Sequence, residues 1–332
     1  MQDNSIGIHT RFSGELAFQV WGAESLDENG NPLPGAKPKQ ELDYQPQMIT
    51  DAFFETWLNG TTDTRADLFS QMGVGNGTTA AAATDTTISQ IGTRFASFNS
   101  VVTYSVSGNE ITQTNQYRTT KGQIIGTISE VGLFRNPTGG LTMMRSLIKD
   151  VEGTPTTLTL TSMDFLYVNW KVKSVVNLSD VTGVINLGGV DYNYVLRPCF
   201  WNSGLGAGTV NTAPFAGLCT TSNVTAALGF TIASARPTQT LGSVTSVPGG
   251  VAFAGQLFST NTYTAGTKHR KMTYKWDITE GNTGSGIGSV TLTNNISSAG
   301  YQVSFSAVSG GGTIPKDNTN ELTLGFTFSY GR

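Results

Sequence analysis

Carboxylates are the residues of this chain that could most readily support catalysis. A glycosidase needs two carboxyl groups that face one cleft, about 5–10 Å apart. The residues with suitable side chains in or beside ordered-looking segments are Glu110, Glu130, Asp150, Asp164 and Asp277. Their spacing selects no pair. Glu130 differs from the others because it interrupts an apolar strand, and we expect it to face outward or to pair with an arginine such as Arg135 or Arg145.

Histidine and cysteine chemistry is limited by the small number of these residues. The two histidines are His9, in an N-terminal stretch that we expect to be flexible, and His269, in the basic cluster 268–271 that we interpret as a solvated strand face. Neither lies beside a nucleophile elbow. Neither is near Cys199 or Cys219. We expect these two cysteines to be unpaired thiols, because the first residues do not resemble a secretory signal and we expect a reducing compartment. We therefore predict no catalytic residue, no metal site and no cofactor.

A glycine run at Gly73, Gly75 and Gly77 has some likeness to a phosphate-binding loop. Such a loop needs a strand before it and a helix after it, and in one class a Gly-Lys-Thr sequence. Here the glycines are followed by threonine and alanine, without the lysine. We predict a tight turn at this position.

The charge balance bears on the partners of the chain. Charged residues make up 13% of the 332 residues and the net charge is -3, whereas soluble proteins average about 25% charged residues. A surface with this charge has no general attraction to nucleic acid. The sequence also contains no run of about 18 apolar residues, the length needed to span a membrane. We expect synthesis in a cytoplasm and contacts with other proteins, through a surface rich in Gly, Ser, Thr and Asn.

Four aromatic residues could form a ligand-contacting surface. Tyr192, Tyr194, Phe200 and Trp201 flank the dipeptide Arg197-Pro198, which looks like a loop. Exposed aromatic rings in such a place could stack on a sugar. The alternative is that these side chains belong to the hydrophobic core.

The apolar pattern predicts an all-β chain with two sandwich or barrel-like domains and one or two short helices. Leu16, Phe18 and Val20 alternate with polar residues, as in a half-buried strand. Residues 49–58 favour a helix. The expected domains are 1–174 and 175–332, because strand-rich stretches separated by Gly, Ser, Asn and Pro fill both. The second domain is also a candidate weak repeat of the first.

The C-terminal segment ends in a strand in which Phe326, Phe328 and Tyr330 share one face. A strand at this position is normally tied into its own sheet. Pairing at a sheet edge with a neighbouring subunit is the alternative.

Several phrases in residues 45–172 resemble a pattern common in tail-associated structural proteins of tailed bacteriophages. Those proteins show a GxGxTxPxxxDTxL segment, a strand EVGLF, a phrase like ARSLF and an IxK phrase. The matching residues are Gly73, Gly75, Thr78 and Asp85-Thr86, then Glu130 to Phe134, Met144 to Leu147 and Ile148-Lys149. An alanine run replaces the proline. MITDAFFETWL also resembles the early helix of such proteins, which often starts NLITDAGL.

The resemblance implies a non-enzymatic virion structural protein, repeated as a homo-oligomer in the tail as a ring, collar, sheath, tail-tip or fibre-adaptor subunit. Its expected partners are copies of itself and other tail or portal-proximal proteins. Two alternatives remain open at this point. One is a host-receptor module that binds a surface glycan, and the other is a capsid decoration protein.

Overall fold

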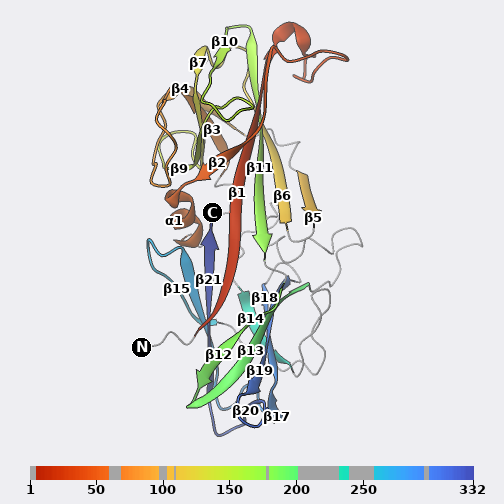
Figure 1. Cartoon of the computed structure of the whole chain (residues 1–332), viewed down its shortest axis with the longest axis vertical. Coiled ribbons are helices and arrows are strands. Elements are labelled where there is room, and N and C mark those ends of the chain that lie inside the picture. Colours follow the sequence, from red (N-terminus) through yellow and green to blue (C-terminus); the bar gives the residue numbers. More distant parts are fainter. Residues whose placement is uncertain are drawn as a thin grey trace. The chain divides into compact units, whose positions relative to one another are not determined.

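The computed structural model of the chain describes residues 5–59, 69–96, 103–107, 110–176, 179–200, 232–238, 258–294 and 299–332 (Figure 1). These residues are mostly strands, so the all-β prediction is confirmed. They divide into two compact units. We call residues 12–57, 65–174 and 332 the first unit, and residues 1–11, 58–64 and 175–331 the second unit. The strand β1 (Ser5–Gly22) gives residues to both.

In the first unit one sheet follows the order β5-β6-β11-β1-β2-β9-β8-β3-β4, and a small sheet pairs β10 with β7. After β1 come the 3-10 turn η1 (Ala23–Ser25), β2 (Gln40–Ile49), α1 (Asp51–Asn59), β3 (Gln71–Gly75), β4 (Gln90–Ala96), β5 (Thr103–Ser107), β6 (Glu110–Arg118), β7 (Gly126–Ile128), β8 (Glu130–Phe134), β9 (Thr142–Leu147), β10 (Leu158–Leu160) and β11 (Asp164–Val176).

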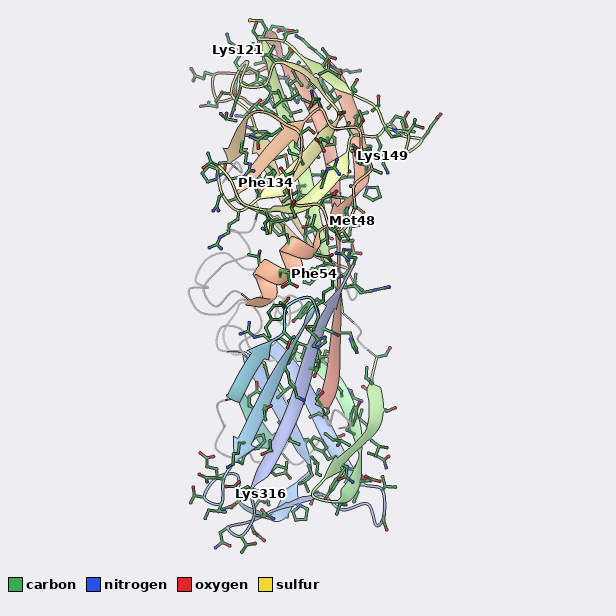
Figure 2. All side chains as sticks on the ribbon, turned by 90° about the vertical axis from the view of Figure 1, so that its left-hand side faces the viewer. Met48, Phe54, Lys121, Phe134, Lys149 and Lys316 are labelled. Carbon is green, nitrogen blue, oxygen red and sulfur yellow. The ribbon has the colours of Figure 1, made fainter. Side chains whose placement is uncertain are left out.

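The core of the first unit forms around α1. Phe53 and Phe54 are consecutive apolar residues of this short helix, and both are buried. Figure 2 labels Phe54 on the helix. Phe53 stacks on Phe69, whose ring lies 4.6 Å from that of Trp170 on β11. The helix begins where Thr50 accepts a hydrogen bond from the backbone N–H of Phe53. The predicted helix at 49–58 is therefore present, and it packs against the strands instead of adding a layer.

The second unit contains two larger sheets and one pair of strands. One sheet has the order β15-β16-β21-β1 and includes the first half of β1, the second has the order β12-β13-β19-β18-β14, and β17 pairs with β20. The strands are β12 (Val181–Leu187), β13 (Val190–Phe200), β14 (Ile232–Thr238), β15 (Phe258–Tyr263), β16 (His269–Trp276), β17 (Thr283–Ile287), β18 (Ser289–Asn294), β19 (Ala299–Ala307), β20 (Ile314–Lys316) and β21 (Leu322–Gly331).

The strand β21 lies inside its sheet. It pairs antiparallel with β16 on one edge and parallel with residues 5–11 of β1 on the other. Phe326, Phe328 and Tyr330 are all buried, and Phe328 packs edge to face on Tyr301 of β19. Because both edges of this strand are occupied within the chain, the alternative in which it pairs with a neighbouring subunit does not hold for β21.

One local prediction needs correction, and two neighbouring strand pairs need separate description. His9 lies in β1 and pairs with Ser329, so this part of the N-terminal stretch is a strand and not a flexible tail. Residues 124–135 form two strands, β7 and β8, because β7 pairs with β10 whereas β8 pairs with β3 and β9. β10 ends at Leu160 and β11 begins at Asp164, so residues 161–163 separate these two strands.

Candidate functional site

The segments that carry the family resemblance meet in the first unit. The loop 76–89 leaves β3 at Gly75 and returns as β4 at Gln90. The strands β8 and β9 are neighbours in the sheet, with Gly132 opposite Arg145. This pairing brings the carboxylate of Glu130 and the guanidinium of Arg145 to the same place beside the loop.

Glu130 is fully buried and all of its polar contacts are made inside the protein. Its Oε2 atom lies 2.8 Å from Nε and 2.7 Å from Nη2 of Arg145. Its Oε1 atom accepts hydrogen bonds from the backbone N–H groups of Gly77, at 3.0 Å, and Ser89, at 2.6 Å. A carboxylate in a site closed to water is tolerated only with such compensation.

Arg145 connects this carboxylate to the far side of the loop. Its side chain is only 6% exposed. Nη1 donates to Oδ2 of Asp85 at 2.6 Å, and Nη2 donates to the carbonyl oxygen of Thr79 at 2.9 Å. A planar guanidinium can serve several acceptors at once in this fixed geometry. We call the three side chains Asp85, Glu130 and Arg145 the loop clamp.

The environment of Asp85 favours its ionised form. Burial alone raises the pKa of this carboxyl group, but the backbone N–H of Ala82 and the guanidinium of Arg145 outweigh that effect. The pKa of Asp85 therefore lies below its ordinary value of 3.8. The hydrogen bond from Ala82 measures 2.7 Å, so Asp85 also fixes the turn within the loop.

The glycine run is explained by the close approach of Glu130. A Cβ atom on Gly77 would lie 2.3 Å from Oε1 of Glu130. A Cβ atom on Gly75 would lie 2.7 Å from the same oxygen and 2.5 Å from the carbonyl oxygen of Ser89. The run is followed by a loop and β4 and not by a helix. These glycines thus admit a carboxylate from the neighbouring strand, and the geometry of a phosphate loop is absent here.

The other carboxylates considered for catalysis have separate local partners. Asp164 accepts a hydrogen bond from Lys39 at 2.8 Å, and Glu110 lies 3.8 Å from Nζ of Lys173. Asp150 accepts backbone hydrogen bonds within its own turn, as does Asp277 in the second unit. Glu130 is the member of this set that joins the loop clamp, and its partner is Arg145, one of the two arginines expected from the sequence.

The aromatic residues proposed as a ligand surface lie in different environments. Arg197-Pro198 belongs to β13 and is not a loop. The pairing of β13 with β12 ends at Leu196, so Pro198 lies past the last residue that pairs with β12. Tyr192 is buried, and the ring of Tyr194 covers Gly183. The side chain of Phe200 and all of Trp201 lie outside the described residues.

Tyr192 nevertheless borders a groove of the second unit. This groove has a volume of about 670 Å³, within the usual range for ligand sites. Burial raises the pKa of the Tyr192 hydroxyl. The groove is lined by the end of β12, by β16, by the segment after β20 and by β21, with Asn186, Lys271, Thr273, Asn320, Glu321 and Thr323 among its polar residues.

No protein-family model matches the chain, and neither a curated protein nor a solved structure matches it. Among the described residues, no group of three or more His, Cys, Asp and Glu side chains is arranged to hold a metal ion; Cys219 lies outside those residues. In the same part of the chain, the helices are too short or too polar to cross a membrane.

Proposed function

We propose that the chain is a non-enzymatic structural protein of a bacteriophage virion and serves as a repeated subunit of the tail apparatus. The observation that carries the proposal is the loop clamp. Three segments that resemble tail-protein phrases, 72–87, 130–134 and 144–147, are far apart in the sequence. They contribute Asp85, Glu130 and Arg145 to one cluster, in which Glu130 and Arg145 are buried and Asp85 is partly exposed. A physical reason for these phrases to occur together supports the resemblance.

The loop clamp also suits a structural role for chemical reasons. A general base needs a free acceptor oxygen within reach of a substrate. Both oxygens of Glu130 are instead occupied by two backbone N–H groups and the guanidinium of Arg145. The arrangement fixes the conformation of the loop 76–89. A fixed surface loop lowers the entropy lost when subunits associate.

The proposal is tested on virions of the phage that encodes the chain. Immunogold labelling with an antibody against the purified chain should place gold on the tail, and mass photometry of the chain should show a defined oligomer. Gold on the head would instead favour the capsid decoration alternative. The virions are also opened to expose internal antigens. If no part of these opened virions is labelled, a virion role is refuted.

The groove bordered by Tyr192 supports a second candidate function, recognition of a host surface glycan. Its walls carry neutral hydrogen-bonding side chains such as Thr273, Asn320 and Thr323 around an aromatic residue. Sugar hydroxyls pair with such groups, and the mild charge of the groove does not select an ionic ligand. The other residues proposed for this surface, Tyr194, Phe200 and Trp201, remain predictions in that role.

Glycan binding is tested with the full chain, because residues 5–11 complete a sheet of the second unit. The unaltered chain is compared with Thr323→Trp, which fills the groove at an exposed position. Binding of one glycan class by the unaltered chain, and loss of that binding in Thr323→Trp, would support a receptor role. A broad panel without binding would remove this candidate and leave the tail proposal untouched.

A further inference from the structure

The strand β12 presents an edge that has no partner strand in the described part of the chain. It ends the five-stranded sheet and pairs only with β13 (Figure 1). The pairing runs through seven successive residue pairs, from Val181–Leu196 to Leu187–Val190, without a register shift. A regular strand of this kind offers an unbroken row of backbone N–H and C=O groups on its outer side.

The sequence of β12 lacks the usual devices that keep a sheet edge from pairing. Natural edges carry lysine, proline or a bulge. β12 reads VTGVINL, with no charge and no proline. Branched residues make up much of it, and the ring of Tyr194 covers its only glycine, Gly183, which stabilises the extended form.

The edge strand β4 in the first unit provides the contrast. Gly92 has a φ of 65°, and the register between β3 and β4 shifts in the segment that contains it. Arg94 adds a charge. Its guanidinium lies over the ring of Phe134 and donates a hydrogen bond to the carbonyl oxygen of Asn136. The register shift and the charge of Arg94 therefore disfavour pairing of another strand with β4, whereas β12 is regular and carries no charge.

We propose that β12 pairs antiparallel with β12 of a second copy of this chain, about a two-fold axis at Val184. This inference rests on the proposed repeated subunit and names the contact. In that register Val181 faces Leu187 of the other copy, and Thr182 faces Asn186. Apolar residues thus meet apolar residues and polar residues meet polar ones.

The exposure of the side chains agrees with such an edge. Thr182, Val184 and Asn186 are exposed on one face of the strand, and Ile185 is buried on the other. Val184 is 60% exposed and lies at the centre of the strand. Two copies of Val184 placed opposite one another would shield each other from water.

The deciding experiment is sedimentation velocity of the full chain over a range of concentrations, with Val184→Lys as the test variant. Two opposed lysines repel and lysine is a typical edge-blocking residue, so the concentration for half-pairing should rise by about tenfold or more. Val308→Lys is the matched control, because Val308 is 55% exposed in the same unit but lies outside β12. The control should associate like the unaltered chain.

A second variant tests the register. In Val184→Cys the two thiols would face each other across the axis, at a separation that a disulfide can bridge with small adjustment. Mild oxidation should give a covalent dimer of Val184→Cys at least tenfold faster than of Val308→Cys. The unaltered chain, which keeps Cys199 and Cys219, gives the background.

Two results overturn the inference. One is a monomeric unaltered chain at every concentration, and the other is a Val184→Lys chain that associates as strongly as the unaltered chain and shows the same circular dichroism. If tails are gold-labelled but Val184→Lys associates as strongly as the unaltered chain, the β12 contact alone is refuted. Loss of pairing in Val184→Lys with no label on virions would refute the tail proposal alone.

Discussion

The two units bury a cation in different ways. In the first unit Arg145 is placed between the carboxylates of Glu130 and Asp85. In the second unit Lys316, labelled in Figure 2, is 1% exposed. Its Nζ atom donates hydrogen bonds to Oδ1 of Asn282 at 2.6 Å and to the carbonyl oxygen of Asp317 at 3.1 Å. Both side chains hold loops, but only Arg145 neutralises a buried charge.

This difference shows which contact the fold depends on more strongly. Removing Arg145 would leave Glu130, which is fully buried, without its counter-charge. Removing the ammonium group of Lys316 would release Asn282 and Asp317, both of which are exposed and can be hydrated. The desolvation cost therefore falls on the first unit.

The largest expected effect is that of Arg145→Met. The change should lower the free energy of unfolding by about 3–5 kcal/mol, because a buried carboxylate loses its partner. The matched control is Arg197→Met, which removes a partly exposed pair with Asp180 and should cost about 0–1 kcal/mol. Urea unfolding measures both. Equal losses in the two variants would contradict the buried role of the loop clamp.

Gly77→Ala should have the next largest effect. Its Cβ atom would clash with the carboxylate of Glu130, and the repositioning should cost about 1–3 kcal/mol. Gly312→Ala is the control, since a Cβ atom there meets nothing within 4 Å. Thermal unfolding followed by circular dichroism compares the two. If Gly77→Ala were as stable as the control, the glycine run would need another explanation.

Lys316→Met sharpens the comparison from the other side. We expect a loss of about 1 kcal/mol or less, since the freed oxygens are exposed and methionine occupies a similar volume. The same urea measurement used for Arg145→Met applies. A loss as large as that of Arg145→Met would show that the buried Lys316 is equally critical to the fold.

The smallest effect concerns the dependence of stability on pH. The pKa of Asp85 is lowered in the folded state. Its contribution to the free energy of unfolding is therefore complete above the ordinary pKa of 3.8, and it disappears as the pH falls through the folded pKa. In Asp85→Asn the decline in unfolding free energy from about pH 5 to about pH 3 should be less steep than in the unaltered chain. Parallel curves would exclude Asp85 as a source of acid sensitivity.

The sequence predicts the strands well where one face is buried and the other is not. Leu16, Phe18 and Val20 alternate and are all buried in β1. The helix was also predictable, because the adjacent Phe53 and Phe54 suit a short amphipathic turn after Thr50. The arginine partner of Glu130 could be reduced to two candidates, because a carboxylate inside an apolar strand needs a nearby cation.

Other features depend on pairing between distant segments and leave little local signal. β8 is buried on both faces, so residues 124–135 show no change of pattern where β7 ends. Arg197-Pro198 looks like a loop in the sequence, because a proline disfavours strand pairing. The sequence does not reveal that the pairing between β12 and β13 already ends at Leu196, before the proline. The resemblance singled out Asp85 but gave it no role, and its contact with Arg145 was not predicted because the two residues lie 60 positions apart.

The pairing of β1 with β21 has a consequence for synthesis on the ribosome. Ser5 contacts Thr327 across 322 residues of chain. At about 5–20 residues per second, residues 5–11 wait roughly 15–65 s for the strand beside them. The first unit can close around residues 12–22 of the same strand during that time. The second unit therefore matures last, and its exposed half-strand is the segment that a chaperone would need to protect.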